Sequence, residues 1–145
     1  MRTKPIAQLR QFNHLASEID AVYHQAALKL GLSDSAMVIL YTICNSGDAC
    51  LLCDVTRSAG ISKQTVNSAL RKLEAEGIVY LEAVNGRQKR VCLTGDGKRL
   101  VQKTVLRVIQ AENEIFSAWT DAEQETYLAL TQRYLSAFRE KIQTL

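Results

Sequence analysis

Apolar residues recur at every third or fourth position through the first thirty residues of the chain. This spacing marks one face of a long helix from Pro5 to Leu30, and its positions are Leu9, Phe12, Ala16, Ile19, Tyr23, Ala26 and Leu30. Gly31 predicts the end of that helix, because glycine readily takes the left-handed conformation found at many helix ends. Ser33 is a good N-cap for a second helix. This second helix is too apolar to be exposed on every side, so we expect it in the core.

The centre of the chain has the signals of two shorter helices joined by a glycine. The segment NSGD at 45–48 predicts a turn, and the next segment predicts a third helix from Leu51 to Ala59 that ends at Gly60. Residues 61–77 predict a fourth helix, with Ser62 as N-cap and Gly77 at its end. One face of the fourth helix is apolar and should anchor it to the core; it consists of Val66, Ala69, Leu70 and Leu73.

A β-hairpin and two long helices are predicted after residue 77. β-branched and aromatic residues at 78–84 and 91–93 flank an Asn-Gly turn signal, so residues 85–90 should form the tip of a hairpin. Thr94 is expected to cap one long helix that runs to Trp119. Thr120 and Glu123 predict a capping box for the last helix. The chain is therefore expected to be mainly α-helical with one small β-hairpin.

The face of the fourth helix opposite its apolar residues is polar and basic. At 100° per residue it holds Gln64, Ser68 and Arg71, flanked by Thr65, Asn67 and Lys72. Glutamine and asparagine pair with adenine, and arginine pairs with guanine, when a helix lies in the major groove of DNA. Lys63, Thr65 and Ser68 suit phosphate contacts near the positive end of the helix. The alternative is an ordinary solvated face.

Positive charge is concentrated in the same part of the chain. Residues 54–103 hold ten lysines and arginines against five aspartates and glutamates, whereas the rest of the chain is slightly acidic. The predicted hairpin tip carries Arg87, Lys89 and Arg90 within four residues. These cations repel one another, which does not stabilise the fold, and a bound anion would offset the repulsion. A phosphate backbone fits this role, and a solubilising turn is the alternative.

The segments GISKQTVNSALRKLEAEGIVYLE, NGRQKR and LTGDGKRL, followed by a long helix and TDAE, resemble the MarR family of winged-helix regulators. The resemblance covers nearly the whole chain. It implies a winged helix-turn-helix with N- and C-terminal dimerisation helices in a single domain of residues 1–145. Residues 1–31 and 98–145 would be the dimerisation helices, and residues 32–97 the DNA-binding lobe. The family's frequent acidic residue at the start of the wing is Asn85 here, so no salt bridge is expected to brace the wing.

The function implied is that of a homodimeric, cytoplasmic transcription regulator that binds a pseudo-palindromic site in double-stranded DNA. The expected DNA-binding residues are Ser62, Lys63, Gln64, Thr65, Asn67, Ser68 and Arg71 on the recognition helix, with Arg87, Lys89 and Arg90 on the wing. The exposed apolar stripes of the first and last helices support a dimer, since monomers rarely expose such patches. The chain has no segment of about 18 apolar residues, so no membrane partner is expected.

The resemblance also implies an effector, because members of this family often respond to small phenolic or anionic ligands or to thiol oxidation. Tyr23, Tyr41 and Trp119 are candidates to line an effector pocket, with ordinary core packing as the alternative. The family's peroxide sensors use a cysteine on the first helix, where this chain has none. His14 and His24 lie ten residues apart and do not share a helix face for joint metal binding.

Two further alternatives remain open from the sequence. Cys50, Cys53 or Cys92 would make the protein a redox-responsive or metal-responsive regulator, although the CxxC of Cys50 and Cys53 lacks the second pair that completes a zinc site. A winged helix that binds proteins rather than DNA is the other alternative. We expect no enzyme and no cofactor, because the chain has no phosphate-binding glycine loop and no nucleophile motif.

Overall fold

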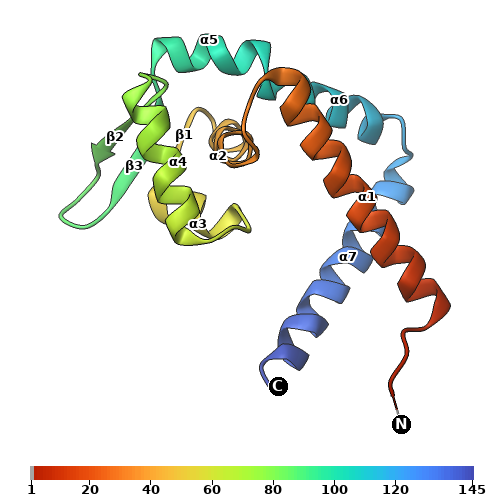
Figure 1. Ribbon diagram of the computed structural model, residues 1–145. Helices are drawn as coiled ribbons and strands as arrows, with labels where there is room; N and C mark the ends of the chain where they lie inside the picture. The colour runs from red at the N-terminus through yellow and green to blue at the C-terminus, as the bar shows by residue number, and fades with distance from the viewer. Residues whose placement is uncertain (1) are drawn as a thin grey trace. The chain divides into compact units, whose positions relative to one another are not determined.

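The computed structural model describes residues 2–145 and consists of helices with one small sheet (Figure 1). The elements in order are α1 (Ala7–Leu30), α2 (Asp34–Asn45), β1 (Ala49–Leu51), α3 (Leu52–Ser58), α4 (Lys63–Ala75), β2 (Val79–Ala83), β3 (Lys89–Leu93), α5 (Gly95–Lys103), α6 (Val105–Ser117) and α7 (Asp121–Ile142). Backbone contacts divide them into a first unit that ends at Val108 and a second unit, Ile109–Leu145. The mainly α fold with a small β wing is confirmed. The boundaries predicted at 31/32 and 97/98 stay predictions.

The core of the first unit is built around α2. Ile39, Leu40 and Ile43 of this helix have no exposed surface, and α2 packs against α3, α4, β1 and β3. Val55 of α3 and Val66 of α4 are fully buried as well. The expectation that the second helix belongs to the core is therefore confirmed. Burial of each such side chain stabilises the fold by roughly 1.5–3 kcal/mol.

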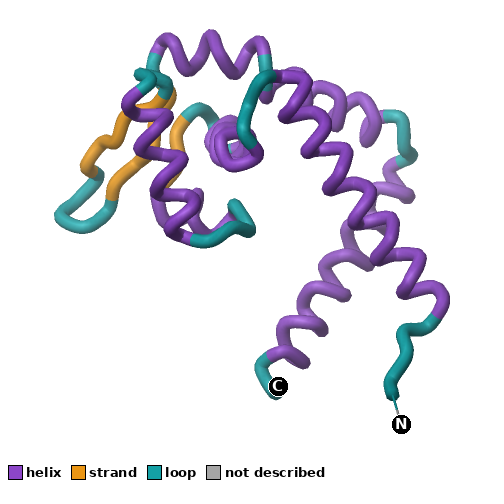
Figure 2. The backbone as a smooth tube through the Cα atoms, in the orientation of Figure 1, coloured by secondary structure: helices purple, strands orange, loops and turns teal. Residues whose placement is uncertain are grey.

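The sheet is antiparallel with the order β1-β3-β2, so β3 is its central strand (Figure 2). Val91 in β3 lies opposite Cys50 of β1 and Leu81 of β2, and it is fully buried. The sequence prediction missed β1 and placed Leu51 in the third helix, which in fact begins at Leu52. A strand of three residues has no periodicity of its own, and β1 exists because β3 pairs with it.

The predicted helix ends are confirmed where local chemistry decides them. Gly31 has φ 71° in the left-handed region at the end of α1. The Ser33 hydroxyl accepts a hydrogen bond from the Ala36 amide at 3.1 Å. In the capping box, the Glu123 amide donates to the Thr120 hydroxyl at 3.1 Å and the Thr120 amide donates to the Glu123 carboxylate at 2.9 Å. Hydrogen bonding from the Thr120 backbone amide, and then from its side chain, holds the pKa of the Glu123 carboxyl below its ordinary value.

The single helix predicted from Thr94 to Trp119 is wrong, because it breaks at Thr104. There the backbone turns to φ −126° and ψ −93°, so that α5 and α6 are separate helices. The Thr104 hydroxyl donates to the Leu100 carbonyl at 2.8 Å. A threonine that donates to the carbonyl four residues before it competes with the helical hydrogen bonds and often bends a helix. Thr104 is also buried, so the break lies inside the first unit.

Most residues of the second unit are exposed. Phe116, Trp119 and Tyr127 form a ring cluster with centroids 4.9–5.9 Å apart. The Gln124 side-chain nitrogen, Nε2, donates to the Phe116 carbonyl at 2.6 Å, which ties α7 to the end of α6. None of the α7 residues, all of which the structure describes, is buried.

Among residues 2–145, no single helix is long and apolar enough to cross a membrane. Only α1 and α2 taken together have the length and apolar composition of a membrane span, and the angle between these two helices is 96°.

Gly97 in α5 tests how tightly this helix packs on the sheet. A Cβ atom at this position would collide with the Ile78 carbonyl, which is backbone and cannot rotate away. We expect Gly97→Ala to lower the free energy of unfolding by about 1–3 kcal/mol, measured by urea denaturation. Gly95→Ala in the same helix is the matched control, because its Cβ would meet only the Arg99 side chain at 3.8 Å. Equal stability of the two variants would contradict this packing.

Candidate nucleic-acid interface

The N-terminus of α4 is fixed by Ser62. Its hydroxyl accepts a hydrogen bond from the Thr65 amide at 3.2 Å, which confirms the predicted cap. The same hydroxyl lies 2.7 Å from the Thr65 hydroxyl, so the two side chains bind each other. Both residues therefore have a structural role at this helix end. The sequence predicted that role for Ser62 but not for Thr65. The three amides that remain at this helix end give it a partial positive charge.

The outer face of α4 is exposed as the sequence predicts. Val66, Leu70 and Leu73 are buried against the core. The polar positions are all exposed, and they are Lys63, Gln64, Thr65, Asn67, Ser68 and Arg71. A helix held by one face and polar on the other can present side chains to a groove.

The wing differs from the predicted hairpin in where the strands end. Lys89 and Arg90 belong to β3 and not to the tip, and the loop between the strands is residues 84–88. Arg90 lies opposite Glu82 in β2 and Leu51 in β1. Of the three predicted wing cations, only Arg87 stays in the loop. The Asn-Gly signal did not give a two-residue turn, because Val84 pairs with Gln88 instead, its amide donating to the Gln88 carbonyl at 2.9 Å.

Asn85 holds the wing loop in shape. Its side-chain oxygen accepts hydrogen bonds from the Gln88 amide at 3.2 Å and the Arg87 amide at 3.4 Å. Its side-chain nitrogen donates to the Gln88 side chain at 3.0 Å. An asparagine that bonds to amides two and three residues later is a common way to stabilise a turn. The loop that carries Arg87 is thus braced by an amide side chain.

Cationic side chains from three elements gather around one hollow of about 410 Å³, which we call the basic hollow. Arg57 comes from α3, Lys63 from α4, and Arg87 and Lys89 from the wing. Sequence reasoning missed Arg57, which also lies 3.5 Å from the Asp54 carboxylate within its own helix. The only signal for it was the positive charge of the central segment. A concave surface lined by cations concentrates anions near it.

A neighbouring hollow of about 310 Å³ continues this surface along α4. Asn67 and Lys89 line both hollows, while Arg71 and Glu74 line the second one. The structure thus brings Lys63, Asn67, Arg71, Arg87 and Lys89 to one continuous surface. Gln64 and Ser68 are exposed on α4 but line neither hollow, and Arg90 lines neither as well.

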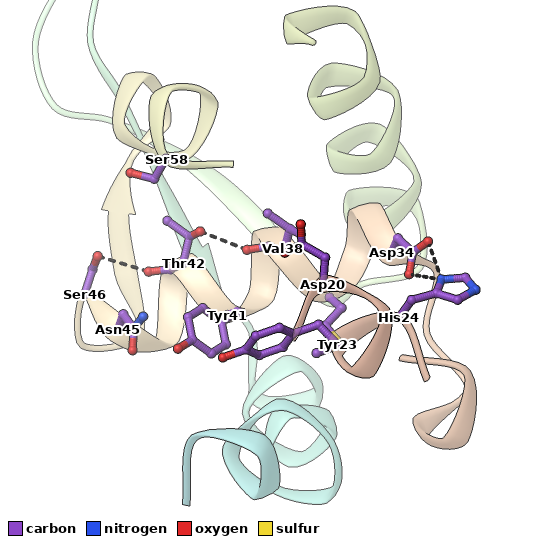
Figure 3. A pocket seen from close by; sticks show the side chains of 11 residues that line it. Asp20, Tyr23, His24, Asp34, Val38, Tyr41, Thr42, Asn45, Ser46 and Ser58 are labelled. Carbon is purple, nitrogen blue, oxygen red and sulfur yellow. Dashed lines mark hydrogen bonds and ion pairs between the residues drawn. The ribbon is translucent and has the colours of Figure 1, made fainter. Parts of the chain in front are cut away.

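A separate pocket of about 560 Å³, the tyrosine pocket, lies between α1, α2 and the end of α3 (Figure 3). Tyr23 and Tyr41 line it, as the sequence suggested, whereas Trp119 lines a hollow in the second unit. The remaining lining residues are Asp20, His24, Asp34, Met37, Val38, Thr42, Asn45, Ser46 and Ser58. The His24 Nδ1 atom lies 2.8 Å from both carboxylate oxygens of Asp34, which joins α1 to α2.

The four cysteines are free thiols that differ in exposure. Cys44 is half-buried, Cys50 and Cys92 are buried, and Cys53 is exposed at the basic hollow. Burial raises the pKa of the Cys44 and Cys50 thiols to about 11, with smaller contributions from nearby carboxylates. In residues 2–145, no group of three or more histidine, cysteine or acidic side chains is placed to hold a metal ion.

The comparisons with known proteins agree with this geometry. The helix-turn-helix of α3 and α4, with a three-stranded sheet that includes the β2–β3 hairpin, makes the first unit a winged helix. Residues 30–90 match the model of the MarR family. The resemblance predicted from the sequence is confirmed, and residues 30–90 are similar to that family.

Solved structures share this fold over most of their length. NMB1585, a MarR family regulator from Neisseria meningitidis, is 20% identical with a TM-score of 0.76, covering 94% of this chain and 96% of that one. Sco3205 from Streptomyces coelicolor, solved in complex with DNA, is 18% identical with a TM-score of 0.69 and coverage of 93% and 90%. BpsR from Bordetella bronchiseptica, whose DNA binding is regulated by 6-hydroxynicotinic acid, is 24% identical with a TM-score of 0.61 and coverage of 86% and 98%. No curated protein sequence is a significant match.

Thiol accessibility gives a direct test of the cysteine environments. At neutral pH we expect one thiol per folded chain to react quickly with a maleimide, because Cys53 is exposed while burial keeps the Cys44 and Cys50 thiols protonated. Cys53→Ser should abolish the fast phase in a stopped-flow or mass-spectrometric assay. Cys44→Ser is the control and should leave that phase unchanged. Fast labelling of the Cys53→Ser protein would show that a second thiol is reactive.

Proposed function

We propose that this protein is a sequence-specific regulator of transcription that binds double-stranded DNA in the cytoplasm, and that it is not an enzyme. The observation that carries the proposal is the basic hollow, where Arg57, Lys63, Arg87 and Lys89 meet beside the exposed face of α4. A surface with this charge attracts phosphates along a duplex while the helix reads bases. The DNA complex of the structurally similar Sco3205 supports it.

The recognition helix is assigned two kinds of contact. Gln64 and Arg71 are proposed to reach base edges, since both side chains are exposed and can form paired hydrogen bonds with adenine or guanine. Lys63 and Ser68 are proposed to contact phosphates, helped by the positive end of the helix. Asn67 lies between the two hollows and is proposed to contact a base next to the wing. Ser62 and Thr65 act by shaping the helix N-terminus, and their contacts with DNA are secondary.

The wing cations are assigned different roles because of their places in the hairpin. Arg87 lies in the loop and is proposed to enter the minor groove, where narrow A·T-rich segments attract arginine. Successive residues of a strand point to opposite faces, and Lys89 lines the hollows beside α4. Arg90 therefore faces the other side, opposite Glu82. We assign Lys89 to DNA ahead of Arg90, whose contribution is a long-range attraction.

A single substitution in the wing tests the proposed function. Arg87→Ala should weaken operator binding and lower the slope of log K against log salt by roughly 1.8, because a dimer loses two phosphate neutralisations. The free energy of unfolding should change by less than about 0.5 kcal/mol, since Arg87 is exposed. Fluorescence anisotropy over a range of salt concentrations measures both affinity and slope.

Lys29→Ala removes the same charge from α1 and is the matched control, expected to leave affinity nearly unchanged. An unchanged salt slope for Arg87→Ala would make the wing an ordinary solvated loop. If the unaltered chain is not retained on duplex DNA at low salt, the winged helix is instead a module for protein contacts.

We further propose that the protein acts as a homodimer formed through α1, α6 and α7. In the first unit, Phe12 and Ile19 of α1 are 51% and 53% exposed, and in the second unit Leu128 and Phe138 of α7 are 58% and 48% exposed. Large apolar patches of this kind are rare on monomers. A twofold dimer would bind a pseudo-palindromic site with half-sites about one helical turn apart.

The dimer is tested by placing a charge on its proposed interface. Leu135 is a further exposed apolar residue of α7, one turn before Phe138. Leu135→Glu should convert a dimer at micromolar concentration into monomers in sedimentation velocity, because burying an unpaired carboxylate is costly. Its affinity for a full operator should fall towards that for a half-site. Ala137→Glu, on the opposite face of the same helix, should remain dimeric. A stable monomer of the unaltered chain would rule this interface out.

The remaining part of the proposal is that a small effector in the tyrosine pocket controls DNA binding. In the simplest case the protein is a repressor, and the effector releases it from DNA. The pocket touches α1, which belongs to the proposed dimer interface, and Ser58 at the end of α3, next to the recognition helix. A ligand that binds one arrangement of these elements better than another shifts their populations. Regulation of BpsR by a small molecule supports this assignment.

A further inference from the structure

The charge of the tyrosine pocket is negative. Asp20 and Asp34 are among its lining residues, and no lysine or arginine is among the described residues that form it. The one ionisable base is His24, and both carboxylate oxygens of Asp34 lie 2.8 Å from its Nδ1 atom. His24 is therefore already paired with Asp34. In the part of the chain that the structure describes, Asp20 has no ion-pair partner.

The walls of the pocket are aromatic and apolar. Tyr23 comes from α1 and Tyr41 from α2, and in Figure 3 both rings extend in the same direction with their hydroxyl groups towards Asn45. Met37 and Val38 add apolar surface. The faces of tyrosine rings carry partial negative charge and attract cations within about 6 Å. Carboxylates and aromatic faces together form the usual environment for an organic ammonium group.

We propose that the tyrosine pocket binds an organic cation, such as a protonated or quaternary amine joined to a ring or hydrocarbon group. The inference rests on the proposed function of this pocket as an effector site and adds the charge class of its ligand. An anion would meet the Asp20 carboxylate and no available cation, whereas a cation would meet in Asp20 a carboxylate without an ion-pair partner. The volume of about 560 Å³ is in the range of small-molecule sites.

The same geometry gives the cation a means of acting on DNA binding. Asp20 and Tyr23 belong to α1, while Thr42, Asn45 and Ser46 lie at the end of α2 that leads into β1. Ser58 is four residues before Ser62, the cap of α4. A bound cation contacts all of these elements, and it shifts their arrangement to the extent that it binds one arrangement better.

The test uses two ions of nearly equal size and opposite charge, tetraphenylphosphonium and tetraphenylborate, titrated calorimetrically into the full chain without DNA. We expect the cation to bind at least about five-fold more tightly than the anion, since one partly exposed charge contact is worth up to roughly 1 kcal/mol. Asp20→Asn should weaken binding of the cation by about the same factor and should not weaken binding of the anion. Glu18→Gln removes one carboxylate from the same helix outside the pocket and should leave both affinities unchanged.

Equal or tighter binding of the anion overturns the proposal, as does binding of neither ion. An Asp20→Asn protein with the affinities of the unaltered chain also overturns it. Retention on duplex DNA, measured separately, distinguishes the two levels of inference. Selective cation binding by a chain that does not bind DNA would support the pocket assignment and contradict the proposed function. DNA binding without a preference for the cation would support the proposed function and contradict the pocket assignment.

Discussion

The burial of α2 is the interaction on which the rest of the structure depends. Ile39, Leu40 and Ile43 are fully buried, and α1, α3, α4, β1 and β3 all pack against this helix. The helix α4 is amphipathic and has little apolar surface of its own beyond one stripe. A helix of thirteen residues gains most of its stability from tertiary packing of that stripe. Packing of this stripe on the core therefore determines which face of α4 is exposed.

The second constraint is electrostatic. Arg57, Lys63, Arg87 and Lys89 repel one another around the basic hollow, and folding gains nothing from their proximity. The repulsion is tolerated because these side chains are exposed and water screens their charges. The same screening explains why binding of a polyanion there should depend strongly on salt. Charge is thus arranged for a partner, while stability comes from the apolar core on the other side of α4.

The two hollow regions of the first unit have opposite character. The basic hollow faces outwards beside the wing, whereas the tyrosine pocket is lined by Asp20, Asp34 and two aromatic rings. The two regions share α3, which contributes Arg57 to one and Ser58 to the other. A small shift of this short helix would change both surfaces. Ligand charge and DNA charge would then be recognised at separate places by one packed unit.

The sequence by itself determined those features that depend on neighbouring residues. Helix caps such as Ser62 and Thr120 bond to amides within three residues, so the sequence shows both partners at once. The amphipathic face of α4 follows from helical periodicity for the same reason. The tertiary structure alone decided that β1 exists, that Lys89 belongs to a strand, that a helix breaks at Thr104 and that Arg57 joins the wing cations. Strand pairing and side-chain convergence depend on residues far apart in the chain, and no local pattern records which of them will meet.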